Sequence, residues 1–420
     1  MKRIRRSAAV FSALALALPL PVAAAGAAVA APPPAAVAAA PAHAAVQLEL
    51  PRPTGPYAIG RSTLHLADTS RRDPWVPSAG ARELMVSMYY PARAGGGDGA
   101  PAPYMTTEEA RLLLEKQKAG RTFPPEILSG TRTHARTAAR PLAGRHPLVV
   151  LSPGFSLNRA TLSLLSEELA SRGYVVALVD HAYESFGTAF PDGRTLTCVA
   201  CDVAENAPTE EDARKVMAKV ADGRAADASF VIDQLTGRRR DAGTADTAGT
   251  AGTASPARKF SRIIDAHRIG MAGHSIGGNS AAAAMAGDRR IRAGVNMDGT
   301  FFSRVPRSGL DGRPFLMLGS KAGHSPGSED ISWPEDWRKL DGWKRWLTVA
   351  DAGHFTFIDL PVLAAQAGVS DPSAPLSGKR SGEITRDYVG AFFDQHLRGI
   401  HRPLLDGPTA ANPEVVFNSP

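Results

Sequence analysis

The strongest indication of the fold is the stretch Arg268-Ile-Gly-Met-Ala-Gly-His-Ser-Ile-Gly-Gly-Asn-Ser-Ala281. It begins as an apolar strand, passes through a turn in which Gly273 and Gly277 flank Ser275, and continues as an Ala-rich helix. This is the G-x-S-x-G pattern of a nucleophile elbow, a strained turn with no room for side chains at the flanking positions. The N–H groups at the start of the helix also favour negative charge near the serine Oγ. We therefore predict that Ser275 is a nucleophile, the alternative being an incidental serine in a Gly-rich turn.

Short β-branched or apolar runs alternate with helical patterns on both sides of this stretch, which indicates an α/β fold with a mostly parallel sheet and helices on both faces. We expect eight strands, at residues 62–67, 83–90, 148–152, 175–180, 268–273, 294–297, 315–319 and 346–350. We expect helices at residues 106–118, 157–171, 210–235, 277–286 and 382–398. The first two strands should form an antiparallel hairpin at the edge of the sheet.

A nucleophilic serine needs a base and an acid, which in this architecture follow it in the order acid, then histidine. Asp298, in Asn296-Met-Asp-Gly, ends the strand after the elbow and is the predicted acid. A purely turn-forming Asp-Gly pair is the alternative interpretation. Glu329 and Asp330, after the following strand, are the competing acids.

The predicted base is His354, which follows Gly353 just after the last strand. His324 is its rival, although it lies in a Ser-Pro-Gly loop after the preceding strand. His274 adjoins the nucleophile on a turn and should pack or orient rather than react. If His354 is the base, it must be neutral to act. We therefore predict that kcat/KM rises with pH through a pKa of about 6 to 7.

An acyl-transfer site also needs donors for the developing oxyanion. We assign this role to the backbone N–H groups of Ile276, directly after the nucleophile, and Phe155, in the sharp turn Ser152-Pro-Gly-Phe. Aromatic residues that follow the predicted acid, the predicted base and the strand at 175–180 are candidates to line an apolar pocket, and packing in the core is their alternative role. They are Phe301, Phe302, Phe355 and Tyr183.

Taken together, these motifs resemble secreted bacterial members of the platelet-activating factor acetylhydrolase group of α/β-hydrolases. The resemblance rests on Gly273-His-Ser-Ile-Gly-Gly278, Ser152-Pro-Gly-Phe155, Asn296-Met-Asp298, Gly353-His354 and the opening Leu50-Pro-Arg-Pro-Thr-Gly-Pro56. It implies the α/β-hydrolase fold, an acid directly after the elbow strand, and hydrolysis of short or modified acyl groups from lipid esters without a metal or other cofactor. Pro153-Gly154 replaces the His-Gly turn of the animal enzymes, and an Ala-Gly-Thr insertion precedes the elbow strand, so the substrate stays open.

Two other functions remain open at this point. A secreted triacylglycerol lipase or cutinase-like polyester hydrolase shares the Gly-His-Ser-x-Gly-Gly elbow but places its acid one strand later. A non-catalytic binder on the same fold is a remote alternative. The expected partner is a lipid or another small ester, with transient contact to a lipid surface through the Trp-rich stretch 333–346, whose alternative role is packing. The sequence does not define the oligomeric state.

The N-terminal pattern and the cysteine content predict that the chain is exported. Residues 1–44 combine a basic start, an apolar run and an Ala/Pro-rich leader, which predicts a cleaved secretion signal; an uncleaved anchor and a twin-arginine signal are the alternatives. A single domain should then cover residues 46–405, with a low-complexity loop at 237–257 and a C-terminal tail at 406–420. Cys198 and Cys201 are the only cysteines, and export favours a local disulfide between them.

The balance of charged residues disfavours a nucleic-acid partner. The chain has 48 Lys and Arg against 41 Asp and Glu, and four of these cations fall within the first six residues. The remainder is close to neutral, without the basic footprint that a polyanion requires.

Overall fold

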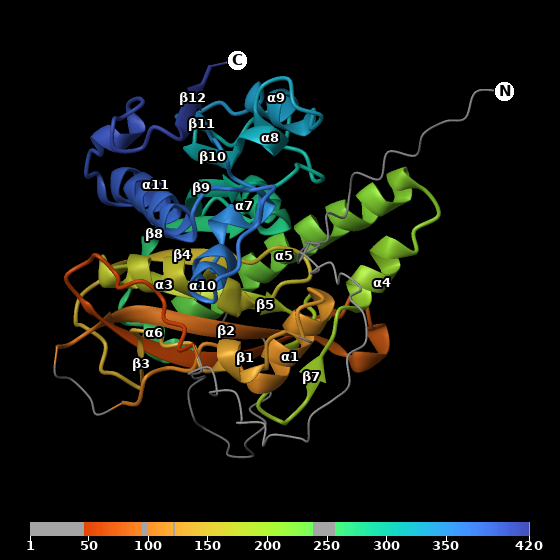
Figure 1. The fold of residues 1–420 in the computed structure, drawn as a ribbon, viewed down its shortest axis with the longest axis vertical. Coiled ribbons are helices and arrows are strands. Elements are labelled where there is room, and N and C mark those ends of the chain that lie inside the picture. Colours follow the sequence, from red (N-terminus) through yellow and green to blue (C-terminus); the bar gives the residue numbers. More distant parts are fainter. Residues whose placement is uncertain (1–45, 95–98, 121, 238–256, 420) are drawn as a thin grey trace, which may run out of the picture.

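The computed structural model describes residues 46–94, 99–120, 122–237 and 257–419 (Figure 1). The predicted signal and leader, and nearly all of the loop predicted at 237–257, lie outside the described residues. The chain folds around a ten-stranded sheet in the order β12-β11-β10-β9-β8-β4-β5-β2-β1-β3, and β6 and β7 form a separate small hairpin. The six central strands from β11 to β5 run parallel. The strands are β1 (Ala58–Arg72), β2 (Ala81–Ala92), β3 (Arg136–Thr137), β4 (His146–Ser152), β5 (Val175–His181), β6 (Thr188–Ala189), β7 (Thr195–Leu196), β8 (Ile264–His274), β9 (Ile291–Met297), β10 (Phe315–Ser320), β11 (Lys344–Val349) and β12 (Val415–Asn418).

All eight predicted strands are present, but the sheet is wider than the eight strands we expected. β3 adds two residues beside β1, and β12 pairs antiparallel with β11, with Val349 opposite Val415. The stretch 406–420, predicted as a tail, therefore contributes an edge strand to the sheet. Both additions are too short to produce a strand pattern in the sequence. The predicted antiparallel hairpin is confirmed as β1 and β2, which joins the parallel strands through β5.

Helices cover both faces of the sheet, as predicted (Figure 1). The α-helices are α1 (Thr107–Lys116), α2 (Glu126–Ser129), α3 (Ser163–Ser171), α4 (Val199–Glu205), α5 (Glu210–Thr236), α6 (Arg258–Ser261), α7 (Ile276–Gly287), α8 (Lys321–His324), α9 (Ser332–Trp337), α10 (Leu360–Gln366) and α11 (Gly378–Arg398). Short 3₁₀ helices occur at Pro77–Ala79, Arg159–Leu162, His354–Phe357 and Pro403–Leu405. Within the described residues, no helix combines the length and the apolar character needed to cross a membrane.

The alternation of side chains along the central strands builds two separate cores. In β4, Val149 and Leu151 pack on the face that carries α3 and α11. Their neighbours Leu148 and Val150 pack on the opposite face, against α5 and α7. Successive residues of a strand point to opposite faces, so a strand buried on both sides must be apolar throughout. Burial on both faces therefore explains the continuous apolar run at residues 148–151.

The helix α3 is buried more completely than its amphipathic pattern indicates. Glu167 and Glu168 are both buried, although they are charged. The carboxylate of Glu167 accepts hydrogen bonds from the backbone N–H groups of His134 and Ala135. Glu168 accepts from the N–H of Thr54 at 2.9 Å. Segments before and after β1 and β2 therefore cover this helix and satisfy its carboxylates, an arrangement that no local pattern encodes.

Candidate active site

The turn between β8 and α7 holds Ser275 in a strained backbone conformation. Its φ is 55° and its ψ is −125°, a combination that L-residues rarely adopt. A Cβ on Gly277 would overlap the carbonyl oxygen of Ser152, and a Cβ on Gly273 would overlap the backbone of Gly277. The prediction that both flanking positions require glycine is confirmed, because β4, the turn and α7 approach too closely for any side chain.

The structure brings Ser275, His354 and Asp298 together in one hydrogen-bonded chain. His354 Nε2 lies 3.0 Å from Ser275 Oγ, and His354 Nδ1 lies 2.7 Å from Asp298 Oδ2. A carboxylate only accepts hydrogen bonds, so Nδ1 carries the proton and Nε2 is free to accept the proton of the serine. The His354 side chain is 42% exposed, whereas the Asp298 side chain is almost fully buried. His354 is therefore open to solvent, whereas Asp298 is shielded from it.

The loop that ends β9 fixes Asp298. Asp298 has a φ of 57°, and its N–H donates to the carbonyl of Leu318 at 2.9 Å. The amide of Asn296 donates to the carbonyl of Gly299 at 2.7 Å and accepts from the Gly299 N–H at 2.9 Å. A Cβ on Gly299 would overlap the carbonyl of Ser275. The Asn-Met-Asp-Gly sequence thus encodes both the turn and its packing against the elbow.

Two of the competing residues, His324 and Asp330, lie close to Asp298, whereas Glu329 is exposed. His324 Nδ1 lies 2.7 Å from Asp298 Oδ1, on the side of the carboxylate opposite to His354. Asp330 contacts the other ring nitrogen of His324 at 3.2 Å. Burial alone would raise the pKa of Asp298, but the charge of His324 and hydrogen bonds from His324 and His354 hold that pKa well below its ordinary value. Asp298 is therefore an ionised carboxylate between two imidazoles.

His274 packs against His354 and hydrogen-bonds to its backbone. Its Nε2 donates to the backbone carbonyl of His354 at 2.7 Å, and the two ring centres are 4.7 Å apart. Burial, and then the proximity of His354, lower the pKa of His274 to about 3, so its ring is neutral. It orients the loop that carries His354, as its position next to the nucleophile predicted.

The turn with Phe155 lies next to the first turn of α7, since Phe155 and Ile276 belong to one apolar cluster. Ile276 is the first residue of α7, and an N–H at that position has no acceptor within the helix. The turn 153–156 is held at both ends. Ser156 N–H donates to the Glu184 carbonyl at 3.0 Å, and an Arg224 guanidinium N–H donates to the Pro153 carbonyl at 2.5 Å.

Ser152, directly before this turn, belongs to a second Ser-His-Asp chain, which no local sequence pattern indicates. His181 connects Ser152 Oγ, at 3.0 Å, to Asp227 Oδ2, at 2.8 Å. Burial and the charge of Arg224 lower the pKa of His181, so its ring is neutral like that of a base. However, Ser152 is only 1% exposed, and its Oγ also accepts from Arg224 at 3.3 Å. No substrate could reach it, so this chain is structural.

Arg82 anchors the same buried network. Its guanidinium contacts Asp73, Glu184 and Asp227 at 2.7 to 2.9 Å, and all four side chains are at most 1% exposed. Burial disfavours its charge, but the three carboxylates outweigh this effect and raise the pKa of Arg82 above its ordinary value. The network ties β2 to α5 and to the segment that holds the Phe155 turn.

We expect Arg82→Ala to lower the free energy of unfolding by about 3 to 5 kcal/mol, because three buried carboxylates lose their common partner. Urea unfolding followed by circular dichroism would measure the loss. Arg111→Ala is the matched control, since Arg111 contacts Glu108 and Glu115 only at the exposed surface, where ion pairs contribute little. Similar midpoints for both variants would contradict this account.

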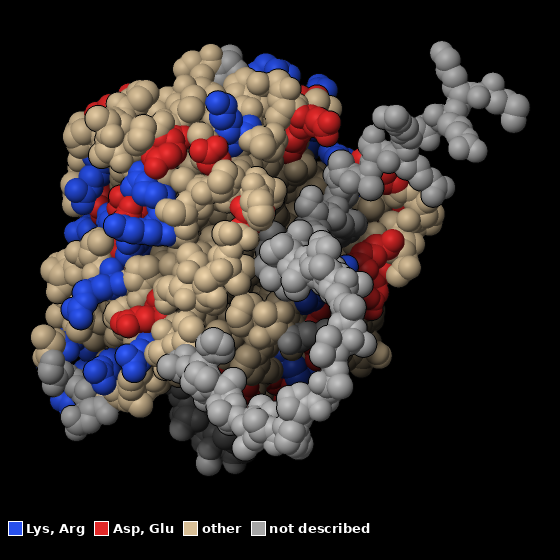
Figure 2. Space-filling view, in the orientation of Figure 1, with Lys and Arg blue, Asp and Glu red and all other residues tan. Residues whose placement is uncertain are grey.

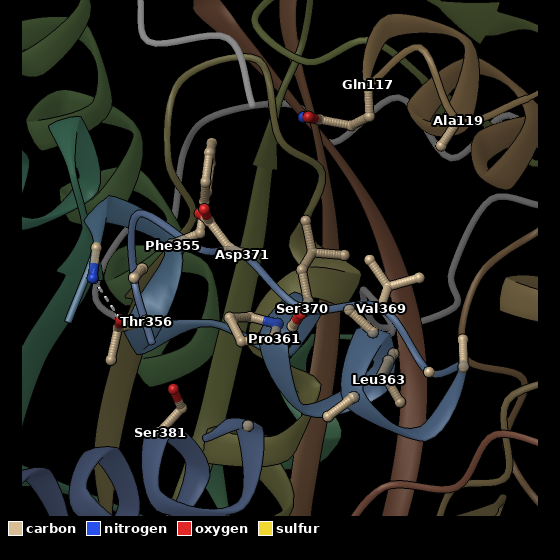
Figure 3. A pocket seen from close by; sticks show the side chains of 18 of the residues that line it. Gln117, Ala119, Phe355, Thr356, Pro361, Leu363, Val369, Ser370, Asp371 and Ser381 are labelled. Atoms are coloured by element: carbon tan, nitrogen blue, oxygen red, sulfur yellow. Dashed lines mark hydrogen bonds between the residues drawn. The ribbon is translucent and has the colours of Figure 1, made fainter. Parts of the chain in front are cut away.

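An apolar cavity of about 710 Å³ opens beside His354. Figure 3 shows Gln117 and Ala119, just after α1, across the cavity from Val369, Ser370 and Asp371, with Phe355 at one side. The lining is mostly aliphatic, with Leu113, Leu363 and Ala364 among its residues. Figure 2 shows that Lys and Arg gather toward α3 and α11, whereas the surface over α10 carries few charges. The structure therefore has an apolar compartment next to His354.

The four residues predicted to line a pocket lie in different surroundings. Phe355 lines the cavity, and its ring lies 5.5 Å from that of His354. Phe302 is half-buried and packs with Phe155 and Ile276. Phe301 is fully buried against Phe315 and Trp333, so it belongs to the core and not to a pocket. Tyr183 packs with Phe190 beside the small β6–β7 hairpin.

Two other sequence predictions concern the surroundings of the site. Cys198 and Cys201 form the predicted disulfide, at the start of α4. Trp333 and Trp346 are fully buried, and Trp337 packs on Trp346, so the Trp-rich stretch fills the space around β10 and β11. In the described part of the chain, no group of three or more His, Cys, Asp or Glu side chains is arranged to hold a metal ion.

Sequence reasoning missed the bond between His324 and Asp298, the Arg82 network and most of the cavity lining. Arg224 and Asp227 lie at i and i+3 on the apolar face of α5, among buried residues such as Val220 and Ala228. Charged residues on an otherwise apolar helix face are the one signal that could have indicated a buried ionic network. The cavity joins segments about 250 residues apart, which no local pattern reveals.

A mostly parallel sheet with a strained serine between a strand and a helix at its carboxyl edge is the architecture of an α/β-hydrolase. The chain belongs to the family described as "Platelet-activating factor acetylhydrolase, isoform II", which it matches over residues 42–368. It is a carboxylester hydrolase, as its relatives are.

Three relatives illustrate the range of this similarity. A probable 1-alkyl-2-acetylglycerophosphocholine esterase from Arthroderma benhamiae is 29% identical over 402 residues, covering 88% of this chain and 93% of that protein. The platelet-activating factor acetylhydrolase of Cavia porcellus is 22% identical, covering 83% of this chain and 78% of its own. A solved ferulic acid esterase from Streptomyces cinnamoneus is 40% identical, with a TM-score of 0.73 over 89% of this chain and 99% of that one.

Proposed function

We propose that the protein hydrolyses short or modified acyl esters of lipids through a covalent acyl-enzyme, with Ser275 as nucleophile, His354 as base and Asp298 as acid. One observation carries this proposal. The hydrogen-bonded chain from Ser275 Oγ through both nitrogens of His354 to Asp298 has the geometry that activates a serine hydroxyl.

The reaction follows from these positions. Ser275 Oγ attacks the ester carbonyl while His354 Nε2 takes its proton, and the N–H groups of Phe155 and Ile276 stabilise the charge on the carbonyl oxygen. The alcohol leaves with the proton from His354, and Ser275 keeps the acyl group. Water then gives a proton to His354 and attacks the acyl carbon, which releases the acid and restores Ser275. The ionised Asp298 stabilises the imidazolium in both steps.

The cavity beside His354 is evidence that the substrate carries an apolar group on one side of its ester bond. Its aliphatic lining has room for an alkyl chain, and the few charges around α10 are compatible with a lipid. Asp298 follows β9, the strand that comes directly after the elbow strand in the chain. This position favours the acetylhydrolase arrangement over the cutinase-like one, whose acid lies one strand later.

A second candidate is hydrolysis of aromatic acid esters. The ferulic acid esterase is more similar to this chain, at 40% identity, than the two acetylhydrolase relatives above. The half-buried rings of Phe155, Phe302 and Trp75, which lie together near Ile276, offer surfaces on which an aromatic acyl group could stack.

A substrate panel tests both candidates. We expect the mature protein to hydrolyse p-nitrophenyl acetate and an acetylated ether phospholipid, with kcat/KM falling by about tenfold or more toward the palmitoyl ester. Selective turnover of methyl ferulate would favour the second candidate, and rates rising with chain length would indicate a general lipase. The Ser275→Ala variant serves as control for each substrate, and full activity of that variant would contradict the proposed mechanism.

We also propose that the chain is exported and loses its first 44 or so residues. The basic and apolar pattern of the N-terminus and the Cys198–Cys201 disulfide support this. N-terminal sequencing of protein recovered from the culture medium would give the cleavage site. Retention of the whole chain inside the cell would contradict it.

A further inference from the structure

His324 is held in one position by four contacts. Its Nδ1 lies 2.7 Å from Asp298 and its Nε2 lies 3.2 Å from Asp330. The ring stacks on Trp333 with centres 4.3 Å apart, and the His324 carbonyl accepts from the indole N–H of Trp346 at 2.7 Å. The side chain is buried. Because the ring is fixed and buried, its two nitrogens hydrogen-bond only to Asp298 and Asp330 among the described residues.

This arrangement defines the charge of His324. Ionised carboxylates only accept hydrogen bonds, so a ring between two of them donates from both nitrogens and is an imidazolium. Asp330 is itself fixed as an acceptor by the Thr300 hydroxyl at 2.6 Å and the Ser332 N–H at 2.7 Å. Burial opposes protonation, but Asp298 and Asp330 outweigh it and raise the pKa of His324 to about 9.

Asp298 is consequently shared between two rings. Its Oδ1 accepts from His324 and from the N–H and hydroxyl of Ser320, at 2.6 to 2.9 Å, while Oδ2 accepts from His354. The other titratable group packed against His354 is His274, which is neutral. The balance of charge around His354 therefore depends on Asp298, Asp330 and the cation between them.

We propose that His324 is a positioning residue of the active site: as a buried cation between Asp298 and Asp330, it fixes the acid and keeps His354 free to accept a proton at lower pH than Asp298 alone would allow. This inference rests on the proposed function of Ser275, His354 and Asp298. His324 makes no contact with the serine and has no role in the chemistry itself. Its effect is to extend esterase activity toward acidic pH.

The charge and the hydrogen bond of His324 can be separated by two variants. His324→Asn can keep a donor near the position of Nδ1 but removes the cation, whereas His324→Phe removes both. We expect His324→Asn to keep the maximal kcat/KM within about tenfold while the midpoint of its acid limb moves up by about one pH unit. His324→Phe should show the same upward shift and a larger loss of the maximum, because Asp298 also loses a donor.

The readout is kcat/KM for p-nitrophenyl acetate between pH 5 and 8.5, with thermal unfolding to confirm that each variant is folded. His396→Asn is the matched control, because His396 packs on Trp343 and Phe392 away from Asp298. We expect its midpoint to be unchanged. A lower maximum with an unmoved midpoint in His324→Asn would reduce His324 to a packing residue and overturn the inference.

A measurement on the unmodified protein keeps the inference testable if the variants do not fold. A nitrogen-15 spectrum of the histidine side chains at pH 7.5 should contain one imidazolium from this site, with both ring nitrogens protonated. A neutral His324 would overturn the inference. Loss of the Ser275 dependence would instead overturn the proposed function, so the two failures are distinguishable.

Discussion

Ser275→Ala is expected to lower kcat/KM for p-nitrophenyl acetate by about 10⁴-fold or more, because Ser275 is the only hydroxyl among the described residues that contacts His354 Nε2. Initial rates with the purified variant would measure this loss. Alanine has no hydroxyl but keeps the Cβ that this backbone already accommodates, so the thermal midpoint should stay close to that of the parent protein.

Ser152→Ala is the matched control for this prediction. Ser152 also contacts a neutral histidine that is bonded to an aspartate, but it is buried among charged groups. We expect this variant to lose stability and to keep Ser275-dependent turnover. If the Ser152 variant lost turnover and the Ser275 variant kept it, the assignment of the two chains would be reversed.

Asp298→Asn is expected to lower kcat/KM by about 10⁴-fold. The asparagine amide can present an N–H where Oδ2 now accepts from His354 Nδ1, and this would favour the ring tautomer that cannot accept the proton of Ser275. A pH series of kcat/KM would show that the loss persists between pH 6 and 8.5, because the defect lies in the tautomer and not in the titration.

Glu329→Gln is the matched control for the acid. Glu329 is exposed and was a competing acid on sequence grounds, so its variant should keep its activity within about twofold. An active Asp298→Asn variant would contradict the acetylhydrolase arrangement and would favour an acid one strand later, as in the cutinase-like alternative.

The positions of the elbow turn, Asp298 and His354 could be predicted because each of them lies in a local sequence pattern. Glycines at 273 and 277 mark the tight turn, and Asn296-Met-Asp-Gly299 carries its own turn-forming bonds. Gly353-His354 follows the last parallel strand. In each case the residues that set the geometry are neighbours in the sequence.

The features that could not be predicted depend on contacts between distant residues. β12 pairs with a strand about 70 positions earlier, and the carboxylates of α3 are satisfied by segments that precede it. His324 looked like a loop residue because Trp333, Asp330 and Asp298, which define its environment, come from three different segments. Phe301 lies in the core, the alternative to a pocket position, since an aromatic residue after a strand can equally turn into the core.

The most direct test of the central claim is covalent trapping of the nucleophile. The protein would be inactivated with a fluorophosphonate ester, digested, and the modified residue located by mass spectrometry. We expect one phosphonyl group per inactivated molecule, on the peptide that contains Ser275, and no labelling of the Ser275→Ala variant. Complete inactivation with Ser275 unmodified, or labelling of Ser152 in its place, would contradict it.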